Sequence, residues 1–190
     1  MIIIGITGTL GAGKGTIVEY LVKNRNFLHF SVREYLAGEI KNRGLPVNRD
    51  TLTTVANELR EKNTPSYIID ELYKEALTSN KNCVIESIRT LGEVESLRSM
   101  GHFYLFAVDA DPVLRYNRIK QRNSETDHVT YETFLANEKR EMSSNDPNKQ
   151  NLQKCREMAD FVIQNESSIE DLHGQVELIL NTKIKEIDEQ

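Results

Sequence analysis

The sequence predicts a three-layer α/β fold, in which a five-stranded parallel sheet carries helices on both faces. Short runs of β-branched and aromatic residues alternate with segments of helical periodicity along the chain, and a glycine-rich turn follows the first run. Such alternation is typical of right-handed crossovers, which make the strands parallel. Because ligands of these sheets bind at the carboxyl ends of the strands, we expect functional residues directly after the strands.

The N-terminal half begins with the pattern of a buried strand at Ile2–Ile6. Apolar residues then follow at helical spacing from Ile17 to Val22, and a second strand is predicted at Phe27–Phe30. Three helices are predicted next, over residues 32–43, from a cap at Asp50, and from the Thr64–Pro65 pair.

The C-terminal half repeats the alternation. Strands are expected at Cys83–Ile85, Phe103–Val108 and Phe161–Ile163. Helices are expected over residues 91–99, from Asp111–Pro112, around Tyr131, and after a cap at Ser167 or Ser168, with a polar loop at 123–128.

The composition favours a single soluble domain, because 190 residues with 38% hydrophobic content suffice for one core. The 24 basic and 29 acidic residues give a net charge of −5, which argues against a nucleic-acid partner. Cys83 and Cys155 form no disulfide or metal-binding pattern, which favours a reducing cytoplasm. No apolar run approaches the roughly 20 residues that span a bilayer, so we expect no membrane segment.

The glycine-rich turn has the spacing of a Walker A phosphate-binding loop and lies between a predicted strand and a predicted helix. Its glycines let backbone N–H groups approach phosphate oxygens, and the helix N-terminus adds donors. Lys14 would place a catalytic charge on the β- and γ-phosphates of ATP, and Thr16 is the candidate hydroxyl ligand of Mg²⁺. The residues assigned to ATP are Gly8, Gly11, Ala12, Gly13, Lys14, Gly15 and Thr16.

The loop and the residues after the third strand resemble the adenylate kinase-like nucleoside monophosphate kinases, a P-loop kinase family. The shared features are the Lys-Gly-Thr ending at Lys14–Thr16 and the stretch Glu86–Thr90, similar to Asp-Gly-x-Pro-Arg-Thr but one residue shorter and without the proline. The resemblance implies that Glu86 lies in the acceptor site and helps to hold Mg²⁺, and that Arg89 is a catalytic residue that binds the acceptor's phosphate. Ser31 lies where that family begins its acceptor-binding helix, with Arg33 nearby, so both are candidates for acceptor binding.

Arg118 and Arg122 are predicted to carry catalytic charge. Four residues apart, they share a helix face and can point at the same phosphates. Phosphoryl transfer depends mainly on positioning and charge stabilisation, which arginines supply. The pair is also similar to the arginines at the start of that family's lid, and Arg115 and Arg140 are further candidates.

For four other residues, the sequence allows both a structural and a functional role. Asp109 and Asp111 are better explained as helix caps than as metal ligands. Arg49 and Arg60 lie where an acceptor-binding subdomain is expected and are candidates to meet the acceptor.

The predicted division of the single domain is a core over 1–31, 81–122 and 159–190, an acceptor-binding helical insert over about 32–80, and a short lid over about 123–145.

These features predict an ATP-dependent phosphotransferase that moves the γ-phosphoryl group of Mg-ATP onto a nucleotide or nucleotide-like small acceptor. The stretch from Ala159 to Asn165, with Leu172 and Val176, resembles dephospho-coenzyme A kinases, which is the alternative activity. The alternative of another class is a nucleotide-binding sensor or accessory module without catalysis. The identity of the acceptor, and the choice between monomer and homodimer, stay open at this point.

Overall fold

A computed structural model describes residues 1–124 and 127–184. Its five strands form one sheet in the order β2-β3-β1-β4-β5, and every neighbouring pair is parallel. The predicted parallel sheet is therefore confirmed. The strands are β1 (Ile3–Gly8), β2 (Leu28–Ser31), β3 (Cys83–Glu86), β4 (Phe103–Asp109) and β5 (Phe161–Gln164).

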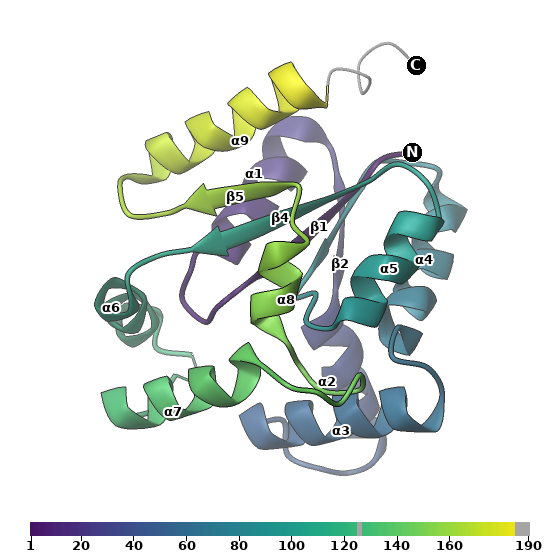
Figure 1. Cartoon of the computed structure of the whole chain (residues 1–190), viewed down its shortest axis with the longest axis vertical. Coiled ribbons are helices and arrows are strands. Elements are labelled where there is room, and N and C mark those ends of the chain that lie inside the picture. The colour runs from purple at the N-terminus through teal and green to yellow at the C-terminus, as the bar shows by residue number, and fades with distance from the viewer. Residues whose placement is uncertain (125–126, 185–190) are drawn as a thin grey trace.

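Helices cover both faces of the sheet, as predicted (Figure 1). One face is covered by α1 (Lys14–Arg25) and α9 (Ile169–Lys183), and the other by α4 (Tyr67–Ser79), α5 (Leu91–Ser99) and α8 (Leu152–Glu157). Successive side chains of a strand point to opposite faces, so β1 serves both cores. Ile4 and Ile6 pack with α1 and α9, whereas Ile3 packs in the other core.

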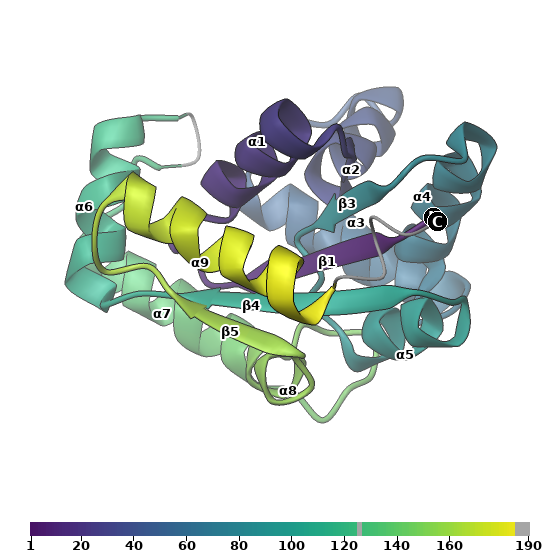
Figure 2. The same ribbon diagram turned by 90° about the horizontal axis from the view of Figure 1, so that it is seen from above.

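Four helices lie at the end of the sheet toward which the strands run. They are α2 (Val32–Asn42), α3 (Arg49–Lys62), α6 (Pro112–Arg122) and α7 (Tyr131–Met142). Figure 1 shows α3 and α7 at the bottom of the molecule, and Figure 2 shows α6 beyond the ends of β4 and β5. This arrangement surrounds the carboxyl edge of the sheet, where ligands bind in such folds.

Several caps agree with the sequence. The side chain of Asp111 accepts hydrogen bonds from the N–H groups of Val113 at 2.8 Å and Leu114 at 3.1 Å, and Pro112 begins α6. Ser168 and Asp171 form a capping box at α9. In the predicted polar loop 123–128, residues 125 and 126 lie outside the described residues. Among the described helices, none combines the length and apolar character needed to cross a membrane.

Two predicted helix starts are wrong. Asn48, not Asp50, caps α3, because its side chain accepts a hydrogen bond from the Thr51 N–H at 2.9 Å. The Thr64–Pro65 pair precedes α4, which begins at Tyr67. The carbonyl oxygen of Pro65 instead accepts a hydrogen bond from the Thr90 hydroxyl at 3.3 Å, so that this pair contacts the start of α5.

Candidate active site

The loop between β1 and α1 requires glycine at specific positions. Gly8, Gly11 and Gly13 have φ angles of 143°, 80° and 103°. A Cβ atom on Gly8 would lie 2.2 Å from the carbonyl oxygen of Val108, and one on Gly13 would lie 2.1 Å from Nδ2 of Asn165. The backbone is therefore packed closely from behind, and it is shaped as a phosphate cradle requires.

Lys14 lies across this loop. Its Nζ donates hydrogen bonds to the carbonyl oxygens of Gly8 and Thr9, each at 2.8 Å. Burial, and then the nearby charge of Arg89, lower the pKa of Lys14 to about 7. An ammonium in this environment gains strongly from an anion, because burial removes the water that would otherwise solvate it.

A single cavity of about 820 Å³ joins the loop to the helices beyond the sheet. This volume lies in the range typical of small-molecule sites. Its loop side is formed by Leu10, Gly11, Gly13, Lys14, Gly15 and Thr16. Gly8 and Ala12 are not among the described lining residues, and they shape the loop from outside the cavity. Its far side includes Arg33, Arg49 and Arg89, which makes that side cationic.

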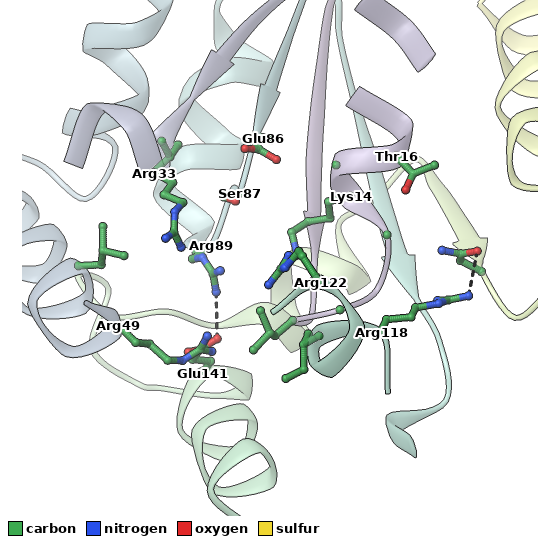
Figure 3. A pocket seen from close by; sticks show the side chains of 18 of the residues that line it. Lys14, Thr16, Arg33, Arg49, Glu86, Ser87, Arg89, Arg118, Arg122 and Glu141 are labelled. Atoms are coloured by element: carbon green, nitrogen blue, oxygen red, sulfur yellow. Dashed lines mark hydrogen bonds and ion pairs between the residues drawn. The ribbon is translucent and has the colours of Figure 1, made fainter. Parts of the chain in front are cut away.

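Glu86 ends β3 and faces the cavity (Figure 3). Its Oε1 accepts a hydrogen bond from the Ser31 hydroxyl at 3.2 Å and lies 3.5 Å from Nε2 of His29. Burial alone would raise the pKa of Glu86, but His29, Lys14 and Ser31 hold it below its usual value. Glu86 is thus an ionised carboxylate at the predicted position. Ser31 itself is buried behind it and caps α2.

Arg89 reaches the far side of the cavity, opposite the glycine-rich loop (Figure 3). Its Nη1 donates to Oε2 of Glu141 at 3.0 Å and to Oε1 of Gln150 at 2.8 Å. Arg49 pairs with the other oxygen of Glu141. The side chain of Glu141 is only 5% exposed. Two arginines from α3 and the β3–α5 connection therefore converge on one carboxylate from α7.

Arg118 and Arg122 line the same cavity but point to different partners. Arg122 forms two hydrogen bonds to Asp127, at 2.8 and 2.6 Å, which raise its pKa. Arg118 points toward Oδ1 of Asn165 at 3.5 Å, away from Lys14 in Figure 3. The expectation that both guanidinium groups meet at one point is therefore wrong for this structure.

Arg115 and Arg140 are not among the described residues that line the cavity. Arg115 is 2% exposed and donates hydrogen bonds to the carbonyl oxygens of Ala110 at 2.8 Å and Leu10 at 3.3 Å. It also pairs with Glu138, so it ties the phosphate loop to α6 and α7. Arg140 lies at the surface, with Nη2 3.6 Å from Oδ1 of Asp50.

Asp109, which ends β4, and Asp111 both make structural contacts. Asp111 caps α6 as described above, and Asp109 pairs with Arg156 and accepts a hydrogen bond from the Ala110 N–H at 2.9 Å. The cap interpretation is confirmed for Asp111. No cluster of His, Cys, Asp and Glu able to hold a metal ion occurs within 1–124 and 127–184.

The residues of the site that were not predicted include Asn165, Gln150 and Glu141. Asn165 directly follows β5, and its Nδ2 donates to the carbonyl oxygen of Ala12 at 2.8 Å. The rule that functional residues follow strands could have found Asn165. Gln150 and Glu141 follow no strand and belong to no motif, so the sequence carried no local signal for them.

The comparisons with known proteins identify the family. Residues 4–146 match the AAA domain family, and the chain belongs to it. A UPF0200 protein of Methanocaldococcus jannaschii is 32% identical, over 95% of this chain and 89% of that protein, so the chain is also a member of the UPF0200 family. A UPF0200 protein of Pyrococcus abyssi is 27% identical over 94% of this chain and 95% of that protein.

Solved structures show the same fold at low sequence identity. TT1252 from Thermus thermophilus is similar with a TM-score of 0.61 and 21% identity, over 96% of this chain and 97% of that chain. Shikimate kinase from Acinetobacter baumannii, in complex with shikimate, is similar with a TM-score of 0.56 and 18% identity, over 97% of this chain and 96% of that chain. The P-loop kinase fold is thus confirmed. The matches show neither an adenylate kinase-like nor a dephospho-coenzyme A kinase relationship.

Proposed function

We propose that this chain is a phosphotransferase that moves the γ-phosphoryl group of Mg-ATP onto a nucleotide or nucleotide-like small acceptor. The observation that carries the proposal is the single cavity that joins Lys14 of the phosphate loop to the arginines Arg33, Arg49 and Arg89. Phosphoryl transfer requires donor and acceptor to lie together in a site rich in positive charge. One cavity of this kind meets both requirements.

The donor side fits a nucleotide triphosphate and Mg²⁺. The glycine conformations at Gly8, Gly11 and Gly13 leave room for phosphate oxygens close to the backbone. Thr16 and Glu86 both line the cavity and offer a hydroxyl and a carboxylate as candidate metal ligands. Mg²⁺ usually takes only one or two protein ligands besides phosphates and water, and when bound it neutralises phosphate charge.

The proposed roles of the other residues follow from their positions. Lys14 and Arg122 stabilise charge on the transferring group. Arg89 and Arg33 bind the acceptor's phosphate, and Ser31 positions Glu86 through the 3.2 Å hydrogen bond. Arg118 lies beside Asn165 at the far end of the loop. We therefore propose that Arg118 contacts the donor nucleotide away from its γ-phosphate.

The acceptor side combines positive charge with an apolar wall. That wall consists of Val32, Leu36, Leu52 and Ala56 from α2 and α3. An acceptor with a phosphate and an uncharged ring or chain matches such a surface, because each part meets its complement. Dephospho-coenzyme A also has these features and remains the alternative acceptor.

The free, buried thiols of Cys83 and Cys155 support a reducing cytoplasm as the location.

The test is ADP release from ATP, measured over a panel of nucleoside monophosphates, deoxynucleoside monophosphates and dephospho-coenzyme A. We expect turnover with one acceptor class and loss of that turnover in Lys14→Ala. Turnover of dephospho-coenzyme A alone would select the alternative acceptor. Tight ATP binding with turnover of no acceptor would contradict the proposal and favour a non-enzymatic sensor.

A further inference from the structure

The carboxylate of Glu141 occupies the acceptor side of the cavity. It comes from the last turn of α7, and both of its oxygens are bound, one by Arg49 and one by Arg89. Two arginines that converge on one point form an arrangement that proteins commonly use to bind a phosphate group. Glu141 therefore stands where an anionic group of the acceptor would be expected.

The electrostatics show that this carboxylate is charged. Burial alone would raise the pKa of Glu141, but Arg89 and Arg49 hold it below its usual value. Arg49 is not fully satisfied by this pairing. Its Nε is buried and has no hydrogen-bond partner among the described residues. A buried donor of this kind gains free energy when a ligand supplies an acceptor atom.

We propose that Glu141 is a specificity-determining residue, an internal competitor that only a dianionic phosphate group displaces from Arg49 and Arg89. The inference rests on the proposed function, because it places the acceptor in this part of the cavity. If a ligand carboxylate displaced Glu141, Arg49 and Arg89 would exchange one carboxylate for another of equal charge, so the binding free energy would be small. A phosphate monoester carries about −1.5 to −2 charges and three acceptor oxygens, so it competes successfully.

A purely structural role for Glu141 makes a different prediction. The end of α7 also contacts α3 outside the cavity, where Arg140 lies 3.6 Å from Asp50. If Glu141 only docked α7 onto α3, then weakening the neighbouring Arg140–Asp50 pair would have the same effect as removing the charge of Glu141. Arg140→Gln is therefore the matched control for Glu141→Gln.

The experiment measures the affinities of inorganic phosphate and acetate by calorimetry, without ATP. We expect wild type to bind phosphate and not acetate. Glu141→Gln should bind phosphate about tenfold more tightly and also bind acetate, because a like charge no longer opposes the ligand. Arg140→Gln should match wild type. Unchanged or weaker phosphate binding by Glu141→Gln, or equal effects of both variants, would overturn the proposal.

Phosphate bound at the glycine-rich loop is distinguished by adding Arg49→Gln, since Arg49 lies on α3 and not at the loop. The gain from Glu141→Gln should be lost in the double variant, and a gain that persists would overturn the proposal. Hydrogen exchange in wild type gives a second readout, with faster exchange expected at residues 138–142 when phosphate is added. Because no turnover is measured, an enzyme inactive with every acceptor would count against the proposed function and not against this role of Glu141.

Discussion

The Nζ atom of Lys14 lies 2.8 Å from the carbonyl oxygen of Gly8. The lysine thus folds back across the glycine-rich loop that precedes it, and the carbonyl oxygens of Gly8 and Thr9 accept hydrogen bonds from its Nζ. Burial and the charge of Arg89 lower its pKa to about 7. ATP would reverse this effect, because phosphates favour the charged form of lysine.

This reversal predicts a proton uptake. At pH 8 the larger part of Lys14 is neutral in the free protein, since its pKa is about 7. Bound phosphates raise that pKa, so ATP binding at pH 8 should take up close to one proton, as expected for about one titrating group. Calorimetry in buffers of different ionisation enthalpy measures the uptake. The variant Lys14→Met should lose it, and equal uptake by both proteins would contradict the assignment.

Two loop glycines should respond differently to alanine. Gly13 has a φ of 103°, and a Cβ there would lie 2.1 Å from Nδ2 of Asn165. Gly13→Ala should therefore weaken ATP binding, with a backbone cost alone of about 1–2 kcal/mol. At Gly15, which is helical, an added Cβ meets no described atom within 4 Å. Because Gly15 lines the cavity, this variant is compared by stability alone. Gly15→Ala should keep or raise the melting temperature, whereas Gly13→Ala should lower it, and equal losses of melting temperature in both variants would refute the strained loop geometry at Gly13.

The buried pair of Arg60 and Glu93 should be important for stability. Their side chains are 1% and 0% exposed, and the pair joins α3 to α5. Arg60→Met leaves the carboxylate of Glu93 buried without its partner, which should lower the free energy of unfolding by about 3–5 kcal/mol. Urea denaturation measures the loss. The exposed pair of Arg43 and Glu58 is the control, since Arg43→Met should cost no more than about 1 kcal/mol.

Arg89 should affect the acceptor and not the donor. Its side chain reaches Glu141 and Gln150 on the acceptor side of the cavity. Hydrogen bonds to charged groups contribute about 1.5–3 kcal/mol, so Arg89→Ala should raise KM for the acceptor about tenfold or more. KM for ATP should change much less. The surface variant Arg98→Ala serves as control, and an unchanged acceptor KM in Arg89→Ala would remove this residue from the acceptor site.

The strands could be predicted from the sequence because both faces of this sheet are buried. Their β-branched and aromatic residues form continuous apolar runs, as at Ile3–Gly8 and Phe103–Asp109. The six-residue helix α8 was not predicted, because it places only Leu152 and Cys155 in the core. Such a short segment has too few apolar residues to show a helical period.

The loop side of the cavity could be predicted, because its residues are contiguous in the sequence. The far side could not, since Arg89 meets partners 52 and 61 residues later in the chain, at Glu141 and Gln150. Helical spacing correctly placed Arg118 and Arg122 beside one cavity. Spacing could not reveal that Arg118 points toward Asn165 while Arg122 pairs with Asp127. Helical spacing determines which face of the helix a residue occupies, and not the direction in which its long side chain extends.

The central claim is that the loop binds ATP for phosphoryl transfer, and turnover by Lys14→Ala tests it most directly. Lys23→Ala is the matched control, because Lys23 lies on the same helix but pairs with Glu19 at the surface. With the acceptor identified from the panel, kcat for ADP release should fall roughly 100-fold or more in Lys14→Ala, the scale for losing one preorganised charge donor. Lys23→Ala should retain wild-type turnover. Full turnover by Lys14→Ala would contradict the account.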